Sequence, residues 1–316
     1  MSMDAFETIF TQFGPADAQA WKNKIIQDLK GGAFEQLISE QEGIEILPFY
    51  TLQDQSRYQL DIPAKANTSW LITEKVKVRD MAQANQEALK ALQAGAQAIL
   101  FDVEHQAISA ADAAALTKDI LLEVAPVHLL HVRPEDRPAI EQQLPGTCPQ
   151  FIEVPVLTST AEELVYILQQ MQQTTAMEVQ VLWKAGSHYF MEIAKLRALR
   201  WLWQQAGNVL EKQVALTIVS ETGLQRHDAA DEYTNMLRNT TEAMSAVAGG
   251  CDALIIGSHD ISKENTEFGK RIARNIHHIL QFESYFNELA DAAKGSYYIE
   301  YLTYQLAQKA WESWRK

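Results

Sequence analysis

Apolar residues recur along most of the chain in seven short runs that are rich in β-branched residues. The runs begin near residues 70, 97, 127, 150, 178, 214 and 251. Their starts are roughly 23 to 37 residues apart, the length of one strand plus a crossover helix. Between them, residues at helical spacing predict helices over 79–94, 109–123, 160–173, 188–206 and 228–248. Strands that alternate with helices in this way predict a parallel α/β sheet.

Seven or eight such units form either a closed barrel or a wide open sheet. No GxGxxG or GxxxxGK[ST] loop follows the first run, so a nucleotide site of the kind found in open sheets has no support. We therefore expect a TIM-like (β/α)8 barrel. The connection over residues 134–149 contains several prolines and a glycine, and a degenerate or missing strand there would explain why only seven runs are clear.

The N-terminal part departs from this rhythm. Two clusters of apolar residues at helical spacing predict one helix around Phe6 to Phe10 and another from Trp21 to Leu29. The stretch 43–50 is apolar, contains a proline and is too short for a helix, so we expect an extended arm that lies on this chain or on a partner. The predicted organisation is an N-terminal helical and extended region over 1–62 and a barrel with C-terminal helices over 63–316.

Composition limits the partners. The chain has 27 Lys and Arg against 41 Asp and Glu, a formal net charge of −14. Such an acidic surface repels nucleic acid and anionic membranes. Cys148 and Cys251 lie far apart and form no metal-like cluster, which favours two reduced thiols in a cytoplasmic protein. The N-terminal residues lack the pattern of a secretory signal, and no window holds 18 consecutive apolar residues.

Several segments are more specific than this periodic pattern. WKAG at 183–186 leads into FMEIAKLRALR at 190–200, FGKRIARN at 268–275 follows the last run, and GSYYIE at 295–300 precedes the last helix. The N-terminal arm adds a fifth match between Trp21 and Asp54. Taken together, these segments resemble the acyl-CoA-binding barrel of the methylmalonyl-CoA mutase family over nearly the whole chain.

The resemblance implies a coenzyme-B12-dependent isomerase of propionate metabolism that interconverts succinyl-CoA and methylmalonyl-CoA. Such enzymes hold the thioester along the barrel axis, and a separate flavodoxin-like domain carries the corrinoid through the histidine of a D-x-H-x-x-G motif. This motif does not occur in the sequence. We therefore expect the cobalamin-binding domain to be absent from this chain, with adenosylcobalamin held by a partner subunit.

The sequence departs from the family where its substrate contacts are expected. Lys75 stands at the position of the family tyrosine, Thr217 stands at the position of the family arginine, and 150–157 lacks the family histidine. We assign no catalytic, cofactor-binding or metal residue. Because buried apolar surface contributes about 25 cal/mol per Å², we expect apolar side chains to fill the channel. Lys75 should be exposed or paired with Glu104 or Asp102.

The leading hypothesis is thus a small, non-catalytic subunit that forms a heterodimer with a large catalytic mutase subunit and self-associates when isolated. Two alternatives stay open. One is an acyl-CoA-binding barrel that isomerises a carbon skeleton with a cobalamin domain supplied in trans. The other is an unrelated barrel lyase.

Four residues are candidates for a residual site at the barrel mouth: His188, Ser220, His259 and Asp260. Each falls at or just past the C-terminal end of a predicted strand, where barrel enzymes place their chemistry. Adjacent His259 and Asp260 would serve as an acid–base pair. The polarity of loops explains the same residues without any site.

Other polar groups fit structural roles. His128 and His131, three residues apart on a predicted strand, point to opposite faces and do not make a metal pair. The basic residues of 195–200 predict a solvated outer helix face, with Lys195 paired to Glu192. The basic cluster within 270–274 predicts a salt-bridged interface, with phosphate binding as the alternative.

Overall fold

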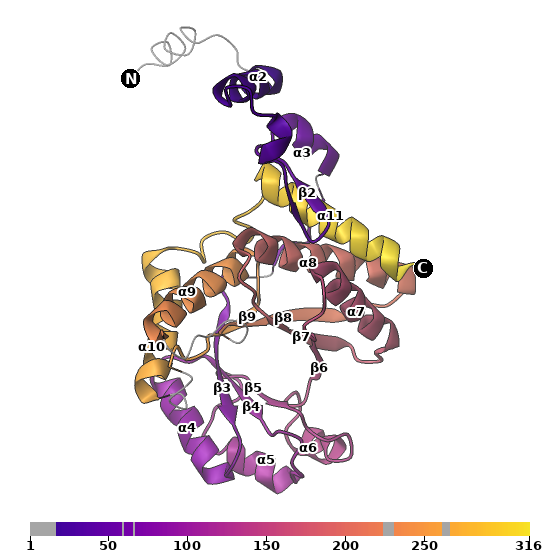
Figure 1. Ribbon diagram of the computed structural model, residues 1–316. Helices are drawn as coiled ribbons and strands as arrows, with labels where there is room; N and C mark the ends of the chain where they lie inside the picture. The colour runs from indigo at the N-terminus through magenta and orange to yellow at the C-terminus, as the bar shows by residue number, and fades with distance from the viewer. Residues whose placement is uncertain (1–16, 59, 66, 224–230, 261–265) are drawn as a thin grey trace, which may run out of the picture. The chain divides into compact units, whose positions relative to one another are not determined.

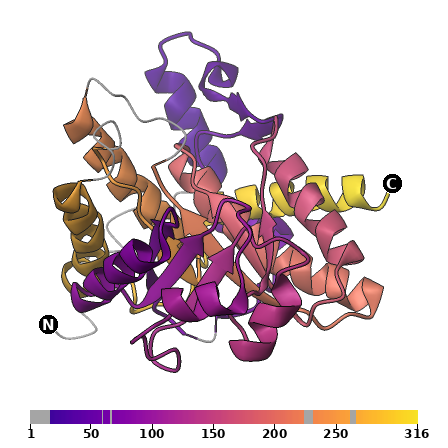
Figure 2. The ribbon, with the colours of Figure 1, turned by 90° about the horizontal axis from the view of Figure 1, so that it is seen from below.

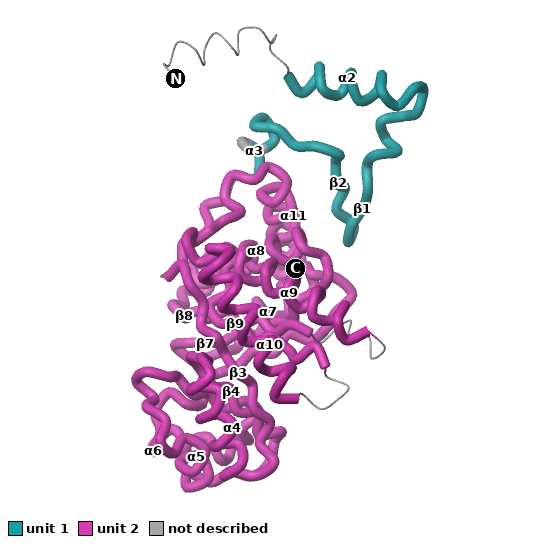
Figure 3. The backbone as a smooth tube through the Cα atoms, turned by 90° about the vertical axis from the view of Figure 1, so that its left-hand side faces the viewer, with its two compact units in different colours: residues 1–58 teal, residues 59–316 magenta. Residues whose placement is uncertain are grey.

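The computed structural model describes residues 17–58, 60–65, 67–223, 231–260 and 266–316 (Figure 1). The chain forms two compact units, residues 1–58 and 59–316 (Figure 3). Among the helices of the described part, none is long and apolar enough to cross a membrane.

Unit 1 is a small assembly of short elements. In chain order these are α2 (Ala18–Asp28), the 3₁₀ helix η1 (Phe34–Leu37), β1 (Ser39–Gln41), β2 (Ile44–Ile46) and α3 (Leu52–Tyr58). Glu42 and Gly43 both have positive φ and turn the chain so that β2 pairs antiparallel with β1. Phe49 stacks on Trp21 with ring centroids 5.3 Å apart. The expected arm therefore folds back within its own unit, while the helix expected around Phe6 to Phe10 lies outside the described residues.

Unit 2 contains the parallel sheet. Its strands are β3 (Leu71–Lys77), β4 (Ala98–Asp102), β5 (Val127–Leu130), β6 (Gln150–Glu153), β7 (Glu178–Lys184), β8 (Ala215–Glu221) and β9 (Ala253–Ile255). They pair in parallel in the order β5-β4-β3-β9-β8-β7-β6. Each of the seven apolar runs forms one strand, and the helices of the unit lie around the strands (Figure 2).

The helices of unit 2 follow the strands as expected. They are α4 (Met81–Gln93), α5 (Ala110–Leu116), α6 (Arg137–Gln143), α7 (Thr160–Gln173), α8 (Tyr189–Leu210), α9 (Glu232–Ala248), α10 (Glu267–His278), the π-helical turn η3 (Ile279–Glu283) and α11 (Tyr297–Trp314). Asp80, Ser109 and Ser159 begin α4, α5 and α7 by accepting a hydrogen bond from a backbone N–H of the first turn. Helix α11 packs against α7 and α8 (Figure 1).

β5 and β6 are the two ends of the sheet order, and the gap between them is called the seam here. The chain between these strands holds α6 in place of a further strand. Near the seam, the Leu129 amide donates to the carbonyl of Thr147 at 2.7 Å. The prediction of a TIM-like barrel is thus confirmed, with seven strands in the described part of the chain rather than eight.

Two apolar clusters among the described residues contribute to the core of the barrel. One lies between the strands and helices α4 to α6 and includes Val76, Phe101 and Leu129. Because strand side chains alternate between faces, the neighbours of these residues point into the barrel. These form the second cluster, the apolar layer, which consists of Leu100, Leu130, Leu182, Val219, Ala253 and Ile255 with Phe151 packed against it.

Candidate functional site

The C-terminal ends of the strands carry a set of charged side chains that we call the charged layer. Four of its members are the last residue of their strand, one belongs to the middle of β3 and one follows β5 directly. The charged layer consists of Lys75, Asp102, His131, Glu153, Lys184 and Glu221, all of which line one cavity. The C-terminal ends of barrel strands are where such folds place ligand sites.

Lys75 is held inside this layer by carboxylates. Its ammonium lies 3.3 Å from an oxygen of Glu221 and 3.8 Å from one of Asp102. The expected pairing with Asp102 is present, whereas Glu104 pairs with Lys77 at 3.0 Å. The positive charge of Lys75 is therefore balanced within the barrel rather than left unpaired, as burial requires.

His131 links three strands. Its Nδ1 lies 2.6 Å from Asp102, and its Nε2 lies 2.6 Å from Glu153 across the seam. Burial by itself lowers the pKa of His131, but the hydrogen bonds and charges of the two carboxylates outweigh burial and raise that pKa above its usual value. Burial alone would raise the pKa of Asp102; the bonds from His131 and the Glu104 amide lower it instead.

His128 has a separate environment. Its ring lies 3.2 Å from the Gln180 amide nitrogen and packs edge-on against Phe151. Burial lowers the pKa of His128, which favours the neutral ring there. Each histidine therefore has its own partners, and in the described ranges no group of three or more His, Cys, Asp or Glu could hold a metal ion.

The cavity above the apolar layer has a volume of about 440 Å³. Both β3 and β9 contribute residues to its lining, and their backbones pair at two positions, Leu71 with Ala253 and Ile72 with Leu254. Helix α10 contributes the remaining wall, including Arg274. The expectation of an apolar filling therefore describes the middle of the barrel, while its C-terminal end is polar and open.

The basic cluster on α10 is largely engaged. Arg274 pairs with Glu74 of β3 at 2.9 Å, and Lys270 pairs with Glu87 of α4. Arg271 lies over the ring of Phe268. Arg274 thus joins α10 to the sheet and Lys270 joins α10 to α4, which favours the salt-bridged interface over a phosphate site.

The four mouth candidates do not converge. Ser220 is buried on β8 with Glu221 as its neighbour in sequence, so their side chains face opposite ways. His188 is exposed at the start of α8. Asp260 accepts hydrogen bonds from Ser258 and Thr266. The neighbouring His259 is buried, and its Nδ1 atom has no hydrogen-bond partner among the residues described.

Sequence reasoning named Lys75 and Asp102 but missed Glu153, Lys184 and Glu221 as parts of one layer. A signal was present, since each of these three closes an apolar run with a charge. Thr217, which the resemblance predicts to stand at the position of the family arginine, lies near the start of β8 and therefore away from the charged layer.

The predicted solvated face of α8 was wrong. Lys195 and Arg197 are only 4% and 3% exposed. Lys195 lies over the ring of Trp183 on β7, whereas Arg197 faces α11, where it binds Glu300. The expected pair of Lys195 with Glu192 is present at 2.5 Å. Arg197 pairs with Asp291 at 3.0 Å and with Glu300 at 2.9 Å.

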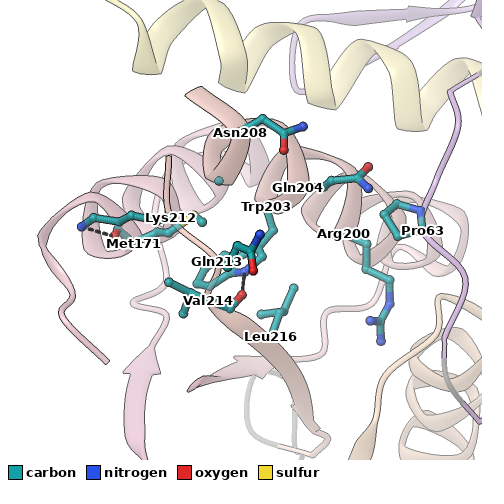
Figure 4. A pocket seen from close by; sticks show the side chains of 11 residues that line it. Pro63, Met171, Arg200, Trp203, Gln204, Asn208, Lys212, Gln213, Val214 and Leu216 are labelled. Carbon is teal, nitrogen blue, oxygen red and sulfur yellow. Dashed lines mark hydrogen bonds between the residues drawn. The ribbon is translucent and has the colours of Figure 1, made fainter. Parts of the chain in front are cut away.

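A second cavity of about 290 Å³ lies between α7, α8 and the beginning of β8 (Figure 4). There Trp203 donates to the carbonyl of Val214 at 2.8 Å, and Lys212 donates to the carbonyl of Gln172 at 2.6 Å. These bonds tie the segment at the N-terminal end of β8 to α8 and to the end of α7. In barrels this end serves stability, so we assign this cavity no chemistry.

Residues 167–316 match the family model described as methylmalonyl-CoA mutase. The chain is 27% identical to the methylmalonyl-CoA mutase small subunit of Porphyromonas gingivalis over 97% of its own length and 63% of that protein. The chain is thus similar in sequence to members of the methylmalonyl-CoA mutase family.

The chain has higher identity to other proteins over shorter stretches. It is 41% identical to the methylmalonyl-CoA mutase of Rhizobium meliloti over 40% of its length and 18% of that protein. It is 35% identical to a probable small subunit from Mycobacterium bovis over 40% of its length and 22% of that protein. The chain thus spans less than two thirds of the relatives it matches. A solved structure of Yersinia pestis DHPS covers 70% of the chain, and the chain covers 99% of it, at 10% identity and a TM-score of only 0.38.

The charged layer does not fit a corrinoid, the group that the family implies. His131 has both ring nitrogens engaged by carboxylates, so neither is free to bind cobalt. The sequence also lacks the D-x-H-x-x-G motif. His131 therefore offers no ligand for the cobalt of adenosylcobalamin.

Proposed function

We propose that this chain is the small, non-catalytic subunit of a coenzyme-B12-dependent methylmalonyl-CoA mutase. In this proposal a large subunit binds adenosylcobalamin, which supplies the radical chemistry, and the small subunit stabilises that partner in a cytoplasmic heterodimer. The similarity to a small subunit over 97% of the chain supports this assignment.

The observation that carries the proposal is the apolar layer. A thioester bound along the barrel axis would have to pass Leu100, Leu130 and Leu182, which are at most 4% exposed. Close-packed interiors do not open without loss of stability, because each large side chain removed leaves a cavity. An axial path for coenzyme A is therefore unfavourable in this chain, which supports a structural role.

Lys75 supports the same conclusion. A tyrosine at this position would offer a hydroxyl and an aromatic face to a substrate. Lys75 instead forms ion pairs with Glu221 and Asp102, so its side chain serves the barrel.

The direct test is co-expression of this chain with a mutase large subunit from the same genome. We expect the two chains to co-purify and the large subunit to be more soluble and more active with the small subunit than without it. The isolated small subunit, supplied with adenosylcobalamin and methylmalonyl-CoA, should show no isomerase activity.

A thermal-shift titration distinguishes the alternative enzyme. Stabilisation of the isolated chain by the large subunit, and not by coenzyme A or methylmalonyl-CoA, agrees with the structural role. Isomerase activity of this chain with a separately supplied cobalamin domain would instead establish the acyl-CoA-binding barrel. Size-exclusion chromatography of the isolated chain tests the expected self-association.

A further inference from the structure

We propose that the cavity at the C-terminal end of the barrel binds a small monocarboxylate that carries a hydroxyl or amino group, with Lys184 as the anchor for its carboxylate. This site goes beyond the proposed function, which assigns no ligand to this chain. It also differs from an axial thioester site, because the apolar layer forms its floor.

Lys184 is the unmatched charge of the cavity. It ends β7, lies in register with Glu221 of β8 and lines the cavity as a half-buried side chain. The described part of the chain places no carboxylate within ion-pair distance, 4.0 Å, of its ammonium. The other cations that line the cavity all have carboxylate partners: Lys75 with Glu221, Lys77 with Glu104, His131 with Asp102 and Glu153, Lys270 with Glu87, and Arg274 with Glu74.

A half-buried ammonium without a counterion is poorly compensated, so an anion that reaches it gains a charge-assisted hydrogen bond. A single unmatched cation calls for a single negative charge. A dicarboxylate or a phosphate dianion would bring its second charge close to Asp102, Glu153 and Glu221, and like charges in such a site repel. The charge balance therefore favours a monocarboxylate.

The rest of the lining defines the other end of the ligand. Glu153 and Glu221 accept from His131 and Lys75, but a carboxylate has further acceptor sites, so a ligand with a donor group can add a hydrogen bond there. Ile72, Ile255 and Ile256 supply an apolar wall for a short carbon chain. A volume of about 440 Å³ lies within the range of small-molecule pockets.

The test is isothermal titration of the purified full-length chain near neutral pH and at low salt. The probes are 3-hydroxybutyrate and 4-aminobutyrate, with butyrate, succinate, inorganic phosphate and coenzyme A as comparisons. We expect a donor-bearing monocarboxylate to bind more tightly than butyrate, and butyrate more tightly than succinate, phosphate or coenzyme A.

Two variants locate the site. Lys184→Met should weaken binding roughly tenfold or more, because it removes one charge-assisted hydrogen bond, and should leave the melting temperature nearly unchanged, since Lys184 has no ion-pair partner to lose. Lys184→Arg should retain part of the affinity. The control is Lys90→Met, which removes an exposed lysine from α4 and should bind as the parent does.

Three results would overturn the site. One is the absence of binding heat from every monocarboxylate up to about 10 mM, a concentration about tenfold above a weak Kd of about 1 mM. Another is equal affinity in the parent and in Lys184→Met. The third is preferential binding of succinate or phosphate. The measurement needs no large subunit, so its failure would leave the proposed subunit role intact.

Discussion

The Nε2 atom of His131 lies 2.6 Å from a carboxylate oxygen of Glu153, and this contact spans the seam between the two ends of the sheet. Nδ1 of the same ring binds Asp102 on the neighbouring strand β4. One imidazole thus joins the two sides of a gap that the strand order leaves at β5 and β6. We call this arrangement the seam latch.

The seam latch should make stability depend on pH. A raised pKa for His131 means that its protonated form stabilises the fold below the usual value of about 6.5, and this contribution is lost as pH rises through the raised value. A lowered pKa for Asp102 acts oppositely: its contribution is present above about 3.9 and is lost as pH falls through the lowered value. The latch is strongest between these limits.

We therefore expect His131→Gln to lower the melting temperature more at about pH 5.5 than at about pH 8.5, by roughly 2–4 °C for each kcal/mol of difference. Circular dichroism melts at both pH values provide the measurement. The control is His188→Gln, which removes an exposed ring; its effect should not change between the two. A constant effect of His131→Gln would show that the latch does not titrate.

The apolar layer should carry much of the barrel's stability. Leu182→Ala removes a buried side chain from the interior, and we expect it to lower the free energy of unfolding by about 2–5 kcal/mol. Leu237→Ala, on the exposed surface of α9, should change it by at most about 0.5 kcal/mol. Urea denaturation compares the two. Equal effects would mean that the barrel interior is not packed as described.

Arg197 should be needed for the docking of α11 on α8. Its guanidinium binds Asp291, Glu300 and the hydroxyl of Thr303, which makes it a buried ion-pair centre. Arg197→Met leaves two carboxylates without their cation, and we expect a loss of about 3–5 kcal/mol of stability. The matched control is Lys77→Met, which breaks the exposed pair with Glu104 and should lose at most about 1 kcal/mol. A small loss at Arg197 would indicate that water replaces the ion pair.

Both thiols should be unreactive in the native chain. Burial raises the pKa of Cys251 to about 12 and that of Cys148 to about 11, and the thiolate is the reactive form. DTNB at about pH 8 should therefore label neither cysteine before denaturation and both after it. Rapid labelling of the native protein would show that one of these thiols is accessible.

The periodic pattern predicted the strands well because a barrel strand carries its signal in its own residues. Each apolar run became a strand of unit 2, and α7 spans the residues that were expected, Thr160–Gln173. The position of the seam also had a local signal, since the proline-containing connection at 134–149 lies between β5 and β6.

The features that the sequence did not predict depend on contacts between distant segments. The burial of Arg197 follows from α11, which begins a hundred residues later, so no local pattern could reveal it. The charged layer needs the barrel register to bring Lys75 to Glu221 and His131 to Glu153. Sequence reasoning saw these residues singly and placed candidates such as His188 in a common site, whereas the strand geometry separates them.

A barrel wall with a seam has two strand edges whose backbone groups are not all used within the wall. Unpaired strand edges can template the addition of strands from another molecule. We expect that alkaline conditions, which release the seam latch, promote edge-to-edge assembly of the isolated chain into higher oligomers. The same opening would let amides of β5 and β6 exchange with deuterium before those of the central strands.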